Sequence, residues 1–191
     1  LHSFPTRRSS DLLMNTPNKL TIMRVIMVPL YLVAVFCWSR YIAMAIFIIA
    51  SLTDLLDGYL ARKNDEITNF GKFMDPLADK LLVTAALVAF IELGQLPSWV
   101  AMVVIGRDLA VDGLRMVAAT KNKVMAAGWS GKVKTATTMV CIPVMLVEPV
   151  ASLGTGIFTV NNHCVLLILI LNVYSMCDYF IHNGKVLLEN K

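Results

Sequence analysis

Charged residues are scarce in this sequence. Asp, Glu, Lys and Arg make up 16% of its 191 residues, whereas 57% are hydrophobic, and the mean hydropathy is +0.68. That balance excludes an ordinary soluble domain, because such domains carry about 25% charged residues. The hydrophobic residues also form long runs. We therefore predict an all-α polytopic membrane protein with six transmembrane helices.

Cysteine is also scarce, and the four that occur are scattered through apolar segments without Cys-x-x-Cys spacing: Cys37, Cys141, Cys164 and Cys177. We interpret them as small buried hydrophobic residues, which excludes a disulfide framework and a cysteine metal site. The sequence also lacks internal repeats, low-complexity tracts and an evident cleavable signal peptide. A single helical domain is the simplest organisation.

Six apolar segments have lengths near the roughly 20 residues that a spanning helix needs, although the third is short. We expect them at Leu20–Trp38, Tyr41–Leu60, Leu77–Leu93, Pro97–Ala119, Val133–Val150 and Cys164–Ile181. Residues 1–13 are polar and aperiodic, and we expect a non-native leader there, followed by one membrane domain over 14–191. The alternative is a basic arm that contacts anionic lipid through Arg7 and Arg8.

Lys and Arg are distributed unevenly around these segments. If the N-terminus is cytoplasmic, only Arg40 among the positions flanking the six segments falls on the outer side. This bias accounts for the net charge of +4 without a nucleic-acid partner. The same orientation places seven aspartates toward the cytoplasmic ends, which predicts a cytoplasm-facing polar cavity in the cell membrane: Asp54, Asp57, Asp75, Asp79, Asp108, Asp112 and Asp178.

Four of these aspartates form two closely spaced pairs. Asp54 and Asp57 are three residues apart and Asp75 and Asp79 are four apart, so on helices each pair shares a face. At a membrane centre each carboxylate would cost about 2.5–3.5 kcal/mol, and divalent metal is the natural compensation. Small residues at matched offsets leave room for a ligand: Gly58, Ala61, Gly71 and Ala78. The pattern suits two metals and a phosphate-bearing substrate.

A simpler explanation exists for one of these aspartates. Asp75 followed by Pro76 resembles a helix N-cap with proline at the first helical position. Capping explains one aspartate, but it does not explain four with small residues at matched offsets.

The spacing Asp-x-x-Asp-Gly-x-x-Ala-Arg, eight residues, Gly-x-x-x-Asp-x-x-x-Asp resembles the signature of the CDP-alcohol phosphatidyltransferases. All signature positions match: Asp54, Asp57, Gly58, Ala61, Arg62, Gly71, Asp75 and Asp79. The resemblance implies a membrane enzyme that transfers the phosphatidyl group of a CDP-linked lipid to an alcohol and releases CMP. It also implies a homodimer.

The resemblance assigns roles to individual residues. Two divalent ions, Mg²⁺ or Mn²⁺, would be bound by Asp54, Asp57, Asp75 and Asp79, with Asp79 also the general base on the acceptor hydroxyl. The segment Pro-Asn-x-x-Thr-x-x-Arg at 17–24 looks like the family's N-terminal nucleotide-side element. The CDP-lipid would then be contacted by Asn18, Thr21, Gly58, Ala61, Arg62 and Thr68.

Three further motifs are Gly-Lys-Phe-Met-Asp-Pro-Leu-Ala-Asp-Lys at 71–80, Gly-Arg-Asp-Leu-Ala-Val-Asp-Gly-Leu-Arg at 106–115 and Gly-Lys-Val-Lys-Thr at 131–135. They are most similar to family members whose acceptor is sn-glycerol 3-phosphate, with CDP-diacylglycerol as donor. Such an acceptor requires cations near the metals, and the inner ends of the fourth and fifth segments supply Arg107, Arg115, Lys132 and Lys134. Each lysine could instead be ordinary cytoplasmic flanking, and Arg115 could pair with Asp112. Asp108 departs from the glutamate expected there, which leaves its role open.

Two other interpretations are kept. The acceptor could be inositol phosphate, serine or phosphatidylglycerol within the same family. From another class, the carboxylates could line the path of an ion-coupled transporter, but the sequence shows neither inverted repeats nor paired broken helices.

Overall fold

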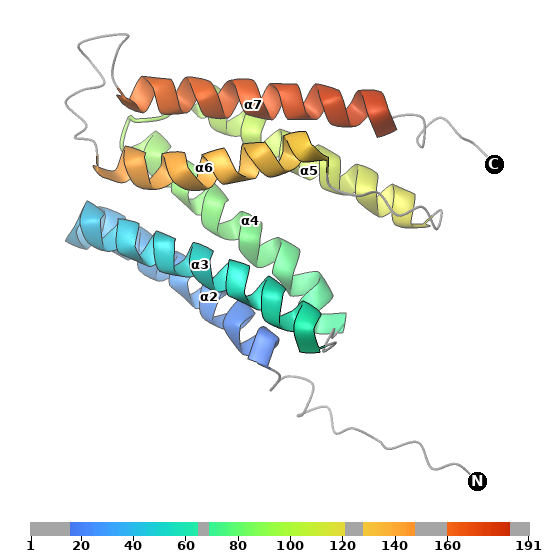
Figure 1. Ribbon diagram of the computed structural model, residues 1–191. Coiled ribbons are helices and arrows are strands. Elements are labelled where there is room, and N and C mark those ends of the chain that lie inside the picture. Colours follow the sequence, from blue (N-terminus) through green and yellow to red (C-terminus); the bar gives the residue numbers. More distant parts are fainter. Residues whose placement is uncertain (1–15, 65–68, 121–127, 148–159, 184–191) are drawn as a thin grey trace. The chain divides into compact units, whose positions relative to one another are not determined.

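The computed structural model describes residues 16–64, 69–120, 128–147 and 160–183 (Figure 1). Every regular element in these ranges is helical, so the all-α prediction is confirmed there. The elements are α2 (Thr16–Val33), the π-helix η1 (Ala34–Trp38), α3 (Arg40–Asn64), α4 (Asn69–Glu92), α5 (Ser98–Thr120), α6 (Trp129–Val147) and α7 (Val160–Asn183). The chain divides into two compact units after Ala86, and α4 crosses that boundary.

The N-terminal unit contains a helical hairpin. Ser39, with an extended backbone, is the single non-helical residue between η1 and α3, and its hydroxyl accepts a hydrogen bond from the Tyr41 N–H at 3.3 Å. This is N-capping of α3. The chain reverses there, so that α2 and α3 lie side by side (Figure 1). The buried rings of Tyr31 and Phe47 pack across the pair with centroids 6.0 Å apart.

α4 begins earlier than the sequence predicts. Its first residue is Asn69, so Asp75 and Pro76 lie inside the helix and the N-cap interpretation of Asp75 is wrong. The C-terminal end is set by Gly94, whose φ of +69° is readily available only to glycine. The Gly94 N–H donates to the Ile91 carbonyl at 3.0 Å and the Gln95 N–H donates to the Phe90 carbonyl at 2.8 Å. This pair of bonds is a Schellman motif, which satisfies the last carbonyls of α4.

The C-terminal unit is built on α5, α6 and α7. α7 packs against both other helices, and Figure 1 shows it beside α6. The apolar core of this unit includes Val111 and Leu114 of α5, which pack against Tyr179 of α7. At the other end, the buried Gln95 amide donates to the Met145 carbonyl at 3.2 Å, and the Asn161 amide donates to the Gln95 carbonyl at 2.9 Å. The turn after α4 is thereby tied to α6 and α7.

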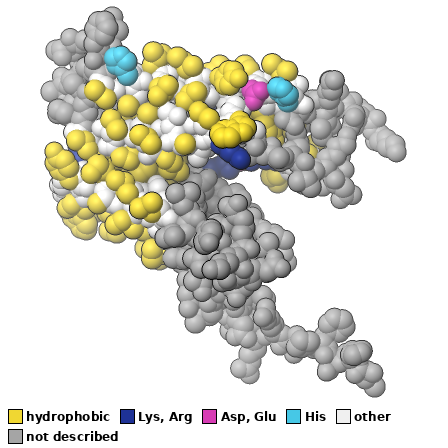
Figure 2. Space-filling view, in the orientation of Figure 1, with side chains coloured by type: hydrophobic (Ala, Val, Ile, Leu, Met, Phe, Trp, Pro, Cys, Tyr) yellow, Lys and Arg dark blue, Asp and Glu magenta, His cyan; other side chains and the backbone are white. Residues whose placement is uncertain are grey.

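Much of the described surface is apolar. In the view of Figure 2, hydrophobic side chains dominate the described surface. Large hydrophobic side chains are also exposed along α5, at Met102, Leu109 and Met116. Exposed apolar surface on this scale marks a membrane or protein contact. Within the described ranges one helical stretch, Val160–His182, is long and apolar enough to span a bilayer by length and composition. The six-span arrangement stays a prediction.

Candidate functional site

The motif aspartates lie in two helices of the N-terminal unit. Asp54 and Asp57 belong to α3, and Asp75 and Asp79 belong to α4, which bears out the helical placement of both pairs. Because the two residues of each pair are three or four positions apart, they lie on the same face of their helix. The side chains of residues 16–21, 54–64 and 69–79, which include Asn18 and Thr21, lie outside the described part, as does Thr68 entirely.

The hairpin register brings the predicted nucleotide-side element to the level of the motif. Tyr31 packs against Phe47 in the antiparallel pair of α2 and α3. Thr21 lies ten residues before Tyr31 and Asp57 lies ten residues after Phe47, so both backbones have advanced about 15 Å toward the same end. By this backbone register, Asn18 and Thr21 share an end of the hairpin with Asp57, Gly58 and Ala61.

The donor set of this motif suits a divalent cation. Carboxylate oxygens are the ligands that Mg²⁺ and Mn²⁺ prefer. Four carboxylates, two from each helix, match the charge of two such ions. Among the side chains that the structure describes, no group of three or more His, Cys, Asp or Glu residues could hold a metal. The four motif aspartates are not among those side chains, so their ligand role stays a prediction.

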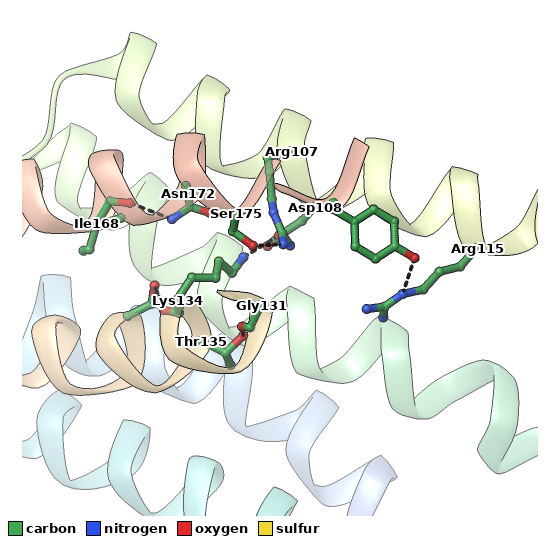
Figure 3. A network of polar contacts seen from close by, with 11 residues as sticks. Arg107, Asp108, Arg115, Gly131, Lys134, Thr135, Ile168, Asn172 and Ser175 are labelled. Carbon is green, nitrogen blue, oxygen red and sulfur yellow. Dashed lines mark hydrogen bonds and ion pairs between the residues drawn. The ribbon is translucent and has the colours of Figure 1, made fainter. Parts of the chain in front are cut away.

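A second polar centre lies in the C-terminal unit, where α5, α6 and α7 meet (Figure 3). The Arg107 guanidinium donates from Nη1 to Asp108 Oδ1 at 2.9 Å and from Nη2 to Ser175 Oγ at 2.6 Å. The Lys134 ammonium forms an ion pair with the same Asp108 oxygen. We call these residues the α5–α7 cluster: Arg107, Asp108, Lys134 and Ser175.

The cluster holds two cations largely away from water. Arg107 is 7% exposed and Lys134 is 6% exposed, whereas the Asp108 side chain keeps 20% of its surface. Both cations meet the same oxygen of Asp108. Burying cations is costly unless anions balance them. Arg107 Nε is also buried and has no hydrogen-bond partner among the described residues. Both features suit an anionic ligand.

The other two cations assigned to the acceptor site lie elsewhere. Arg115 follows Arg107 by eight residues on α5, about 12 Å along the axis. Its Nε donates to the Tyr179 hydroxyl at 3.2 Å, and its guanidinium lies 5.5 Å from the centre of that ring. The Lys132 ammonium lies 5.7 Å from the Trp129 ring centre. The structure therefore gathers Arg107 and Lys134 into one cluster and places Arg115 and Lys132 on aromatic rings.

Sequence reasoning missed Ser175. Asn172, Ser175 and Tyr179 recur at three- and four-residue spacing within the apolar run of α7, and all three are buried. Polar residues at helical spacing in such a run are expected to face a bundle interior. That pattern was the available signal, because only the fold shows that Ser175 meets Arg107, 68 positions earlier.

The comparisons with known proteins agree with the signature. Residues 14–177 match the family model of CDP-alcohol phosphatidyltransferase. The CDP-diacylglycerol–glycerol-3-phosphate 3-phosphatidyltransferase of Bacillus subtilis is 44% identical over 149 residues, which cover 70% of this chain and 77% of the relative. The enzyme of the same name from Salmonella typhimurium is 36% identical over 177 residues, covering 86% and 92%. A probable phosphatidylglycerophosphate synthase from Mycobacterium tuberculosis is 38% identical over 165 residues, covering 83% and 78%.

The chain belongs to the CDP-alcohol phosphatidyltransferase family. It is therefore a transferase of phospholipid biosynthesis, from a membrane-associated family that uses divalent metal ions. Of the relatives above, two are named for the donor CDP-diacylglycerol and the acceptor glycerol 3-phosphate, and the third is named as a probable phosphatidylglycerophosphate synthase.

Proposed function

We propose that this enzyme transfers the phosphatidyl group of CDP-diacylglycerol to sn-glycerol 3-phosphate, giving phosphatidylglycerophosphate and CMP. The observation that carries the choice of acceptor is the convergence of two largely buried cations, Arg107 and Lys134, on one carboxylate oxygen in the α5–α7 cluster. A phosphate ester supplies the anion that such a cluster favours. The names of the relatives point to the same acceptor.

The reacting groups would come from the motif on α3 and α4. Asp79 accepts the proton of the acceptor hydroxyl as its oxygen attacks the β-phosphorus, and CMP departs with the bridging oxygen. When bound by Asp54, Asp57, Asp75 and Asp79, two divalent ions supply charge neutralisation to the diphosphate. The nucleotide end of the donor would be held by Asn18, Thr21, Gly58, Ala61, Arg62 and Thr68.

The acceptor would be held mainly by two of the four cations predicted for it. Arg107 and Lys134 bind its phosphate, because they already converge on one oxygen anion. Arg115 and Lys132 are kept as outer members that attract the anion along the cytoplasmic surface.

We further propose six membrane spans with the site facing the cytoplasm, and a homodimer. The lysine and arginine bias supports the orientation. The exposed apolar side chains of α5 and α7 support contact with lipid or a second copy. The homodimer rests on the family resemblance.

An acceptor panel tests the proposed substrate. Purified protein in detergent is given CDP-diacylglycerol, Mn²⁺ and one alcohol at a time, and CMP release is measured. We expect sn-glycerol 3-phosphate to give at least tenfold faster release than inositol phosphate, serine or phosphatidylglycerol. Faster release with one of the other alcohols would replace the proposed acceptor, and no release with any would remove the transferase assignment.

A further inference from the structure

Ser175 fixes the orientation of the Arg107 guanidinium from a different helix. Ser175 is fully buried on α7, and its hydroxyl oxygen accepts from Arg107 Nη2 at 2.6 Å (Figure 3). On the other side of the same guanidinium, Nη1 donates to Asp108 at 2.9 Å. A planar group held at both terminal nitrogens has little freedom to rotate. The remaining donor, Nε, is the one without a partner among the described residues.

The two hydrogen-bond acceptors of Arg107, Asp108 and Ser175, contribute differently to the cluster. Asp108 is next to Arg107 in the sequence and also pairs with Lys134, so it balances charge between α5 and α6. Ser175 is neutral and carries no balancing charge, so its contribution is geometric. Without its oxygen, Nη2 would be a buried donor lacking an acceptor, and the guanidinium would turn to find another one.

We infer that Ser175 is a positioning residue for the acceptor: its hydroxyl holds Arg107 in the orientation that, with Lys134, receives the phosphate of the incoming alcohol. The inference rests on the proposed function for the identity of that anion. It adds a residue of α7 to a site otherwise made by α5 and α6. Ser175 acts through Arg107 and does not touch the reacting atoms.

The test compares Ser175→Ala and Ser175→Cys with the unchanged enzyme. Cysteine has the shape of serine with a larger terminal atom and accepts hydrogen bonds weakly, whereas alanine leaves the space empty, so an effect that both variants share comes from the lost hydrogen bond and not from packing. Ser130→Ala is the matched control, because it removes a different hydroxyl contact to α7, that of Ser130 on α6 with Asp178. Binding of sn-glycerol 3-phosphate is measured by calorimetry in detergent without CDP-lipid, and Michaelis constants for both substrates are measured separately.

We expect both Ser175 variants to raise the Kd and the Michaelis constant for sn-glycerol 3-phosphate about tenfold, the scale of one hydrogen bond to a charged group. The Michaelis constant for CDP-diacylglycerol should stay within about twofold in both, because a local reorientation of Arg107 leaves the motif on α3 and α4 intact. Ser130→Ala should leave all three constants within about twofold.

Two results overturn the inference in different ways. If the unchanged enzyme binds sn-glycerol 3-phosphate and Ser175→Cys binds it equally well, the positioning role is wrong and the proposed function stands. If the unchanged enzyme binds no sn-glycerol 3-phosphate, the proposed acceptor fails and the inference fails with it. An equal loss for both substrates in both variants would show a general structural role and would also overturn it.

Discussion

At the scale of residues, the structure gives Asp108 a clear role. The sequence placed it toward the cytoplasmic ends and marked it as a departure from an expected glutamate, whereas its Oδ1 is the common acceptor of Arg107 and Lys134. The sequence assigned these two cations to one anion site, but the carboxylate that they share could not be predicted, because it depends on how α5, α6 and α7 pack. Spacing along the chain likewise did not separate Arg115 and Lys132, which lie on Tyr179 and Trp129, from the cluster.

Asp108→Asn should lower stability, because it leaves the two buried cations of the cluster without their carboxylate. Breaking a buried pair costs about 3–5 kcal/mol, and we expect about 2 kcal/mol here because Asp108 is partly exposed. Thermal unfolding in detergent measures the loss, and added sn-glycerol 3-phosphate should restore part of it by supplying an anion. Asp178→Asn, which removes a carboxylate outside the cluster, is the comparison; an equal loss in both variants would refute the special role of Asp108.

Asp79→Asn should reduce turnover at least about 100-fold, because the amide cannot accept the proton of the acceptor hydroxyl. CMP release under saturating substrates measures the effect, with thermal unfolding as the check on folding. Activity near that of the unchanged enzyme would remove Asp79 as the general base.

At the scale of elements, the apolar runs predicted the helices well and their ends less well. The fourth predicted segment, Pro97–Ala119, corresponds closely to α5 (Ser98–Thr120). α4 begins at Asn69, eight residues before the predicted Leu77. The predicted segment covers only the continuous apolar run, whereas residues 69–76 mix apolar and polar residues and so fall outside that run. This mixed first stretch of α4 carries Asp75.

Gly94→Ala should destabilise the protein by about 1 kcal/mol, because Gly94 holds a left-handed backbone at the end of α4. A Cβ at Gly94 would meet nothing within 4 Å, so the cost comes from the backbone alone. Gly113→Ala is the matched control, because Gly113 lies inside α5 with equal space, and alanine there should stabilise by up to about 1 kcal/mol. Thermal unfolding of both variants measures the difference, and a shift of the same sign in both would contradict this account of the turn.

At the scale of the whole molecule, the sequence predicted more than the structure tests. The all-α class is confirmed over the described residues, and the family match confirms the resemblance read from the motif. The number of spans depends on how lipid meets the exposed apolar faces, which a chain without its membrane does not define. The motif could be identified because its eight matching positions lie close together in the sequence. The α5–α7 cluster could not be identified in this way, because Ser175 and Arg107 are 68 positions apart in the sequence.

The predicted orientation places the end of α7 in the cytoplasm. A single cysteine introduced at Lys185, in a variant whose four native cysteines are replaced, should react with a membrane-impermeant thiol reagent only after the cells are opened. The turn beyond the C-terminal end of α4 should lie on the opposite side of the membrane. Pro97 is the position for the second cysteine, because it is exposed whereas Gln95 is buried. Labelling of both positions from the same side would contradict the arrangement.

The central claim is that this enzyme joins sn-glycerol 3-phosphate to the phosphatidyl group of CDP-diacylglycerol. Transfer of label from sn-glycerol 3-phosphate into extractable lipid by the purified enzyme tests it most directly, with CMP measured in the same reaction. The account predicts labelled lipid and CMP in equal amounts, both dependent on divalent metal and abolished by a chelator. CMP release without labelled lipid, or labelled lipid in the presence of the chelator, would contradict it.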